Sequence, residues 1–212
     1  MAVSEATRTA TFTPGRDAAR KEASKLNVPR IGVRFRLPAS MNQVEYFGRG
    51  PAENYLDRNA GSMIGLYKST AEELYFPYVR PQENGHHTDT RWVSLSTGKK
   101  GLLIQADNTI GFNALRNSIE DFDDEEATGL PRQWSNFTPE QVANHDEAAA
   151  KSVLRRQHHI NDITPRDFVE VCVDLKQQGV AGYDSWGSRP EPAYTLPANR
   201  EYNWGFTLIP LK

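Results

Sequence analysis

The stretch from Val44 to Leu95 begins VEYFGRGPAENYLDRNAG, passes through YFPYVRPQENG and ends TDTRWVSL. Glycines and prolines recur among its eight aromatic residues, and Arg49, Arg58, Arg80 and Arg91 are spaced between them. Turn residues fix the path of the backbone, whereas rigid rings and guanidinium groups need defined partners. This composition predicts tight turns and packed rings, and it is too specific for an ordinary exposed surface.

On either side of this stretch, alternation of apolar and polar residues predicts strands. In RIGVRFRL (residues 30–37) every second residue is apolar and most of the others are arginine. This is the pattern of a half-buried strand, and we expect its basic face to meet solvent or acidic groups of its own chain. Further strands are predicted at 43–47, 91–96, 101–106, 110–115, 169–175 and 202–208, with residues 97–100 joining two of them in a hairpin.

Helix signals are sparse. Thr138 and Gln141 form a capping box around Pro139, which predicts a helix that continues to about Ala150. A shorter helical turn is predicted at residues 70–74. The many short strands and the long loops between them therefore predict an all-β fold, an antiparallel β-sandwich with long loops and one or two short helices.

Composition excludes some classes of partner. The 212 residues include 25 basic and 27 acidic side chains, a net charge of −2 that creates no field for nucleic acid or an anionic membrane surface. No apolar stretch approaches the length of a membrane span. Cys172 is the only cysteine, so no internal disulfide forms, and its place inside a predicted strand indicates a small buried apolar residue. The sequence does not distinguish between a cytoplasmic and a periplasmic location of the protein.

Several motifs, in order, carry a family resemblance. FGRGPAENYLDR, PYVRPQENG and TRW are followed by RQHHINDI, VDLKQQGVAGYDSWGSRP and EYNWGFTLIPL. Together they resemble the small-chain, or C-terminal, domain of the β-galactosidases of glycoside hydrolase family 2. The resemblance covers residues 28–212 and implies the large supersandwich related to galactose mutarotase. Residues 1–27 are polar, and we expect an N-terminal extension or a remnant of the preceding part of the domain, with disorder as one alternative.

The resemblance also bears on function. In the family the catalytic acid and nucleophile lie on a separate barrel domain, and no barrel motif occurs in this chain. We therefore expect a domain that is not catalytic in isolation, contains no cofactor, completes the sugar pocket and braces the remaining domains of a parent enzyme that hydrolyses terminal β-D-galactosides. Association with a second copy through an exposed sheet edge is a further possibility.

Three residues are predicted to contact the sugar. The resemblance aligns GYDSWG (residues 182–187) with the family's GDDSW motif, whose tryptophan lines the pocket, so Trp186 is the leading candidate. An indole face stacks on the C–H-rich face of a pyranose; the alternative is a core tryptophan. Glu83 and Asn84 lie in PQENG, a loop that borders the pocket in the family. The alternative for these two is a turn whose side chains cap backbone groups.

Other conspicuous groups have simpler interpretations. The adjacent histidine pairs at residues 86–87 and 158–159 do not match the spacing of zinc ligands, and neighbouring residues of a strand point to opposite faces. No metal site is therefore predicted. The acidic run at 120–126 is typical of a solvated loop. GRGP (48–51) lacks a third glycine and is followed by Glu53, so a tight turn is favoured over a phosphate cradle.

Two other functions stay open from the sequence. One is a free-standing carbohydrate-binding module, which needs an exposed aromatic platform. The other is a mutarotase-like enzyme, which needs an inward-facing histidine and acid, for which no motif is seen.

Overall fold

The computed structural model describes residues 6–12, 27–79, 82–122, 160, 163–184 and 187–212. Its eight strands are β1 (Ala6–Phe12), β2 (Arg30–Pro38), β3 (Gln43–Gly50), β4 (Met63–Thr70), β5 (His87–Ser96), β6 (Gly101–Leu115), β7 (Phe168–Gln177) and β8 (Tyr202–Leu211). Two short 3-10 helices, η1 (Ile119–Phe122) and η4 (Pro192–Tyr194), complete the regular structure of the described residues. All strand pairs among them are antiparallel, which confirms the predicted all-β class.

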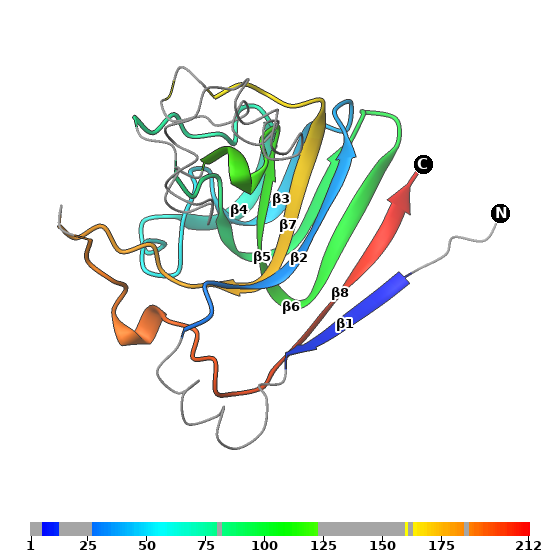
Figure 1. Ribbon diagram of the computed structural model, residues 1–212. Coiled ribbons are helices and arrows are strands. Elements are labelled where there is room, and N and C mark those ends of the chain that lie inside the picture. The colour runs from blue at the N-terminus through cyan, green and yellow to red at the C-terminus, as the bar shows by residue number, and fades with distance from the viewer. Residues whose placement is uncertain (1–5, 13–26, 80–81, 123–159, 161–162, 185–186) are drawn as a thin grey trace, which may run out of the picture.

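The long strand β6 organises the sheet. One edge of β6 pairs with β5, which continues to β3 and β4. The other edge pairs first with β8 through residues 101–106 and then with β7 through residues 111–115. The sheet therefore forks into β8 with β1 and β7 with β2, giving an open, sandwich-like arrangement (Figure 1).

The sequence predicted two strands where the structure has one. Residues 101–106 and 110–115 are both parts of β6, which continues through the exposed segment Asp107–Thr109. The polar residues of that segment lie where β6 leaves β8 and before it meets β7. The predicted hairpin between β5 and β6 is confirmed by a hydrogen bond from Thr97 N to Lys100 O of 2.8 Å.

The predicted helical segments have different outcomes. Residues 70–74 make one turn, in which Leu74 N donates to Thr70 O over 3.0 Å. Thr70 Oγ1 accepts from Glu73 N and Glu73 Oε2 accepts from Thr70 N, a reciprocal cap. The helix predicted from Thr138 to Ala150 lies outside the described residues.

Two strands were not predicted. In β4 the large apolar residues Met63, Ile64 and Leu66 are exposed, so the strand lacks a clear apolar-in, polar-out pattern. Strand β1 lies within the polar segment 1–27 and pairs with β8 from Ala6 opposite Leu208 to Phe12 opposite Tyr202. This segment thus supplies an edge strand of the sheet, while the division of the chain at residue 27 stays a prediction.

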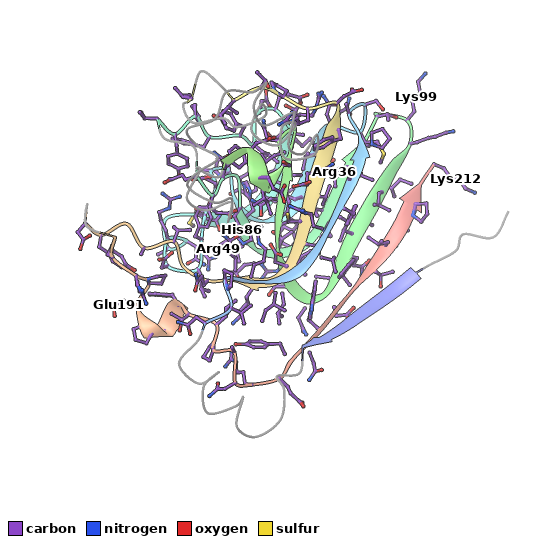
Figure 2. The ribbon with its side chains drawn as sticks, in the orientation of Figure 1. Arg36, Arg49, His86, Lys99, Glu191 and Lys212 are labelled. Carbon is purple, nitrogen blue, oxygen red and sulfur yellow. The ribbon has the colours of Figure 1, made fainter. Side chains whose placement is uncertain are left out.

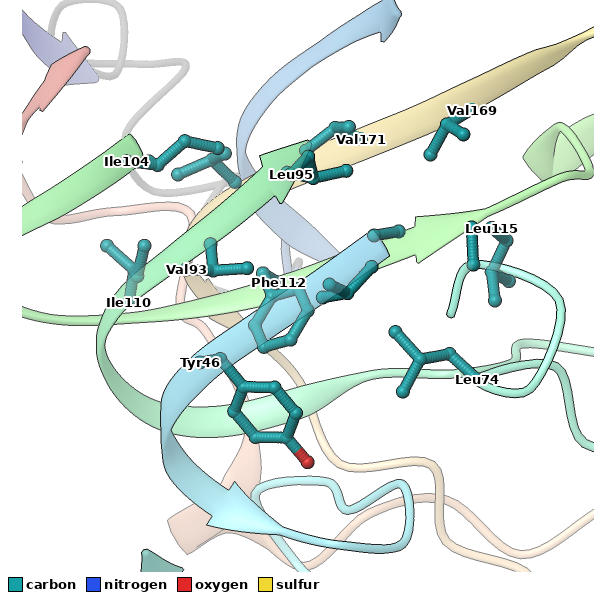
Figure 3. Close-up of a cluster of buried hydrophobic side chains, with 14 of the residues drawn as sticks. Tyr46, Leu74, Val93, Leu95, Ile104, Ile110, Phe112, Leu115, Val169 and Val171 are labelled. Atoms are coloured by element: carbon teal, nitrogen blue, oxygen red, sulfur yellow. The ribbon is translucent and has the colours of Figure 1, made fainter. Parts of the chain in front are cut away.

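The core lies on one face of the sheet. Alternate residues of β7, Val169, Val171 and Val173, are fully buried and pack with Phe112 of β6 and Tyr46 of β3 (Figure 3). Trp204 and Phe206, in the strand predicted at residues 202–208, extend the same cluster. Burial of this continuous apolar face holds the forked sheet together.

The opposite face of β7 is also buried, but it is charged. Glu170, Cys172 and Asp174 are at most 3% exposed, and they lie opposite the basic face of β2. Arg36 Nε contacts Glu170 Oε2 at 2.9 Å, and Arg30 Nε lies 3.1 Å from Asp174 Oδ2. The expectation that the arginines meet acidic groups of their own chain is confirmed.

Candidate functional site

A cavity of about 660 Å³ lies where segments that are distant in the sequence meet. Pro29, at the start of β2, forms part of its wall. Tyr55, Arg58, Tyr78, Gln82 and Glu83 from the motif-rich stretch face residues 177–182 and Pro190 across it. The structure thus brings the PQENG segment together with the chain that leads into GYDSWG, the two segments singled out from the sequence.

Glu83 lines this cavity and is held by one arginine. Its Oε1 accepts a hydrogen bond from Arg30 Nη2 at 3.1 Å, and its side chain is 30% exposed. Arg30 Nη2 also contacts Asn113 Oδ1 at 3.0 Å and Gln177 Oε1 at 2.5 Å. The carboxylate is therefore fixed at the cavity wall, with part of its surface available to a ligand.

Asn84 lies behind the wall. It is 2% exposed and is not among the lining residues. Its Oδ1 accepts from Phe76 N at 2.8 Å and its Nδ2 donates to Phe76 O at 2.5 Å. Next to it, Gly85 has φ +69°, and a Cβ there would lie 2.8 Å from Leu115 Cδ2. This geometry favours the alternative of a capped turn at Asn84, and a sugar contact by its side chain stays a prediction.

Trp186 lies outside the described residues. The residues around it form a turn-rich loop. Gly182, which lines the cavity, and Gly187 have φ of +87° and +83°. Tyr183 N donates to Ser188 Oγ at 3.1 Å, and Ser188 N donates to Asp184 Oδ1 at 3.2 Å.

The motif PAENYLDR forms a compact polar hub beside the cavity. Glu53 accepts hydrogen bonds from Gly85 N at 2.7 Å, Arg58 Nη2 at 2.8 Å, Tyr55 Oη at 3.2 Å and the Tyr78 hydroxyl. Arg58 also lies over the Tyr55 ring. Near the end of β3, Arg49 pairs with the Asp89 carboxylate and donates to the backbone carbonyl oxygens of Asn59 and Ser62. Both arginines thus have the defined partners that guanidinium groups were expected to need.

The structure reveals a buried histidine and acid pair that the sequence did not indicate. His86 is labelled in Figure 2. Its Nδ1 lies 3.9 Å from Asp174 Oδ2 and 2.8 Å from Asn113 Oδ1, and both His86 and Asp174 are 1% exposed. Burial raises the pKa of Asp174 to about 7, although Arg30 opposes this shift. Burial, with the charge of Arg30, lowers the pKa of His86 to about 3. Neither side chain lines the cavity, so the pair lacks the access that sugar chemistry needs.

A sequence signal for this pair existed in two glycines. Gly32 and Gly111 both lie opposite Asp174 in the neighbouring strands. A Cβ at Gly32 would lie 2.0 Å from Asp174 Oδ1, and one at Gly111 would lie 2.5 Å from His86 Cε1. A glycine inside a strand indicates that another group approaches the backbone closely. Which group this is depends on how the strands pair, which the sequence does not show.

The described residues hold no group of three or more histidine, cysteine, aspartate or glutamate side chains arranged to bind a metal ion. Within the same part of the chain, no helix is long and apolar enough to cross a membrane. Cys172 is buried, and burial raises its thiol pKa to about 12, which agrees with the predicted apolar role.

Comparison with known proteins is consistent with the motifs. The sequence profile described as beta galactosidase small chain matches residues 3–208. The chain is 35% identical over 185 residues to a beta-galactosidase of Priestia megaterium, an alignment covering 87% of this chain and 15% of the relative. A beta-galactosidase of Vibrio cholerae is 29% identical over 85% of this chain and 14% of its own length. The chain thus spans about one seventh of these relatives, and it belongs to the beta galactosidase small chain family.

Proposed function

We propose that this chain is the domain of a β-galactosidase that completes the pocket for a terminal β-D-galactoside and braces the other domains of the enzyme. The main observation in support of this proposal is the cavity, in which Glu83 faces the segment 177–182 that leads toward Trp186. Its wall combines aromatic rings with amide, carboxylate and guanidinium groups, the mixture that binds a neutral sugar. In this proposal Trp186 stacks on the pyranose and Glu83 accepts a sugar hydroxyl.

The isolated domain does not hydrolyse the glycoside in this proposal. Glycoside hydrolysis commonly uses two carboxyl groups, one on each side of the bond that is cleaved. Among the described residues that line the cavity, Glu83 is the single carboxylic acid, and it is paired with Arg30. This supports a contribution of the domain to binding, with the hydrolytic carboxyl groups supplied by another part of the longer polypeptide.

The experiment replaces Trp186 with alanine in the full-length β-galactosidase that carries this domain. We expect KM for a chromogenic β-galactoside to rise about tenfold, since stacking of a ring on a ligand contributes on the order of 1–3 kcal/mol. Phe47→Ala is the matched control, because Phe47 is 37% exposed and does not line the cavity. Unchanged kinetics in the Trp186 variant would refute its assignment.

The bracing role is supported by apolar residues on β4. Met63, Ile64 and Leu66 are 71%, 43% and 58% exposed, on a strand at the end of the sheet order. We propose that another domain of the longer enzyme covers them. Leu66→Ser should then lower the melting temperature of the full-length enzyme but leave that of the isolated domain nearly unchanged. Equal shifts in both proteins would contradict this assignment.

A further inference from the structure

Asp57, in the PAENYLDR motif, lies at the tip of a tight turn. Arg58 N donates to Tyr55 O at 2.8 Å and Tyr55 N donates to Arg58 O at 3.3 Å. These two bonds leave Leu56 and Asp57 as the tip of the turn. The Asp57 side chain therefore extends from a backbone that is already fixed.

The Asp57 carboxylate binds the opposite wall of the cavity. Oδ1 accepts from Val180 N at 3.1 Å, and Oδ2 accepts from Ala181 N at 2.8 Å. These amides are 123 and 124 residues away in the sequence. Two successive backbone N–H groups directed at one anion form a concave binding site for it, and hydrogen bonds to an ionised acceptor are about twice as strong as neutral ones.

The wall itself is shaped to receive this carboxylate. A Cβ at Gly179 would lie 2.4 Å from Asp57 Oδ2, so only glycine permits the approach. Ala181 has φ +56°, a left-handed conformation that an alanine rarely adopts. Such a conformation persists where surrounding contacts determine it, and here the bond from Ala181 N to Asp57 is one of them.

We propose that Asp57 is a positioning residue that sets the conformation of the cavity wall at Gly179–Gly182. This inference rests on the proposed function in one respect, namely that the wall contacts a galactoside. Arg58, the next residue, lines the same cavity. The turn thus presents Arg58 to the cavity while Asp57 fixes the wall opposite it.

Amide hydrogen exchange of the intact 212-residue chain tests this inference. In Asp57→Asn, one acceptor oxygen is replaced by an NH2 group that cannot accept from an amide, and the other oxygen loses its negative charge. Exchange at Val180 and Ala181 should therefore accelerate about tenfold to a hundredfold. Gln178 N and Gly179 N bond to Pro29 O and Tyr194 O, and they should keep their protection. Unchanged exchange at Val180 and Ala181 would overturn the proposal.

Two further variants make the result specific. In Gly179→Ala the new Cβ pushes the wall away from the Asp57 carboxylate. This variant should produce the same local acceleration of exchange at Val180 and Ala181. Glu45→Gln removes a carboxylate that pairs with Lys68 at 3.3 Å, away from the cavity, and should leave exchange at Val180 and Ala181 unchanged. Acceleration spread over all strands in Asp57→Asn, with no excess at these two amides, would indicate general destabilisation and overturn a positioning role.

Kinetics of the full-length β-galactosidase separate this inference from the proposed function. Asp57→Asn should raise KM several-fold and leave kcat within about twofold, because the wall binds the substrate without reacting. If local exchange accelerates while both Asp57→Asn and Trp186→Ala leave KM unchanged, Asp57 positions the wall but the proposed sugar contact fails. If Trp186→Ala alone raises KM and exchange at Val180 and Ala181 stays unchanged, the sugar contact stands and the role of Asp57 fails.

Discussion

Replacement of Arg30 with methionine is expected to destabilise the domain by about 3 kcal/mol at pH 8. Removing one partner of a buried ion pair costs about 3–5 kcal/mol, because the other charge stays buried without compensation. Here the side chains of Asp174 and Glu83 are 1% and 30% exposed. Water can replace Arg30 at Glu83 but not at Asp174, so the lower end of the range applies.

The cost should depend on pH through Asp174. Burial raises the pKa of this carboxyl to about 7 in the folded chain, above its ordinary value of about 3.9 in an unfolded one. Its contribution to stability is therefore complete below about pH 4 and is lost as the pH rises through 7. Loss of Arg30 raises the folded pKa further, so the penalty grows above pH 7. At pH 5, where Asp174 is neutral in both proteins, the variant should lose only about 1–2 kcal/mol.

Urea unfolding at pH 5 and pH 8, followed by tryptophan fluorescence, measures this difference. Thermal unfolding at pH 8 should show a decrease of about 6–12 °C, from about 2–4 °C per kcal/mol for a chain of this size. Arg34→Met is the matched control on the same strand. Arg34 is 42% exposed and pairs with the exposed Glu120 at 2.6 Å and with Glu170 at 3.5 Å. Glu170 keeps its contact with Arg36 in this variant, so a loss of about 0–1 kcal/mol is expected. Equal losses at both pH values for Arg30→Met would refute the role of Asp174.

Three further results are expected. Gly32→Ala places a Cβ 2.0 Å from Asp174 Oδ1 and 2.6 Å from the Val173 carbonyl oxygen, and urea unfolding should show a loss of about 1–3 kcal/mol. The pKa of His86 is lowered to about 3 by burial and Arg30, so its stabilising contribution is present above about pH 6.5 and is lost as the pH falls toward 3; His86→Gln should flatten that decline in acid unfolding. Cys172 is 3% exposed, with its thiol pKa raised to about 12, and a chromogenic disulfide reagent should modify it only after denaturant is added.

Most of the strands could be predicted, because alternation reports burial directly. Residues 169–175 show this well: Val169, Val171 and Val173 face the core, and the pattern located β7 to within a few residues. Strand β4 was missed because its large apolar residues are exposed. Alternation of apolar and polar residues predicts a strand only where one face is buried and the other is exposed. An edge strand with exposed apolar residues therefore gives no clear pattern.

Part of the candidate site could also be predicted. Glu83 lines the cavity beside the 177–182 segment, and its contact with a sugar stays a prediction. The sequence could not separate Glu83 from its neighbour Asn84, since both are polar residues of one turn. Asn84 is instead directed at the Phe76 backbone, an arrangement that depends on how the turn at Gly85 packs.

By itself, the sequence determined the all-β class, the family and most strand positions, because these follow from local periodicity and from motifs read in order. Tertiary structure decided which residues meet. Asp57 and Ala181 are 124 residues apart. His86, just before β5, meets Asp174 of β7 because β5 and β7 both pair with β6. A contact of this kind depends on strand register and on the space that glycines leave, neither of which is encoded in a short stretch of chain.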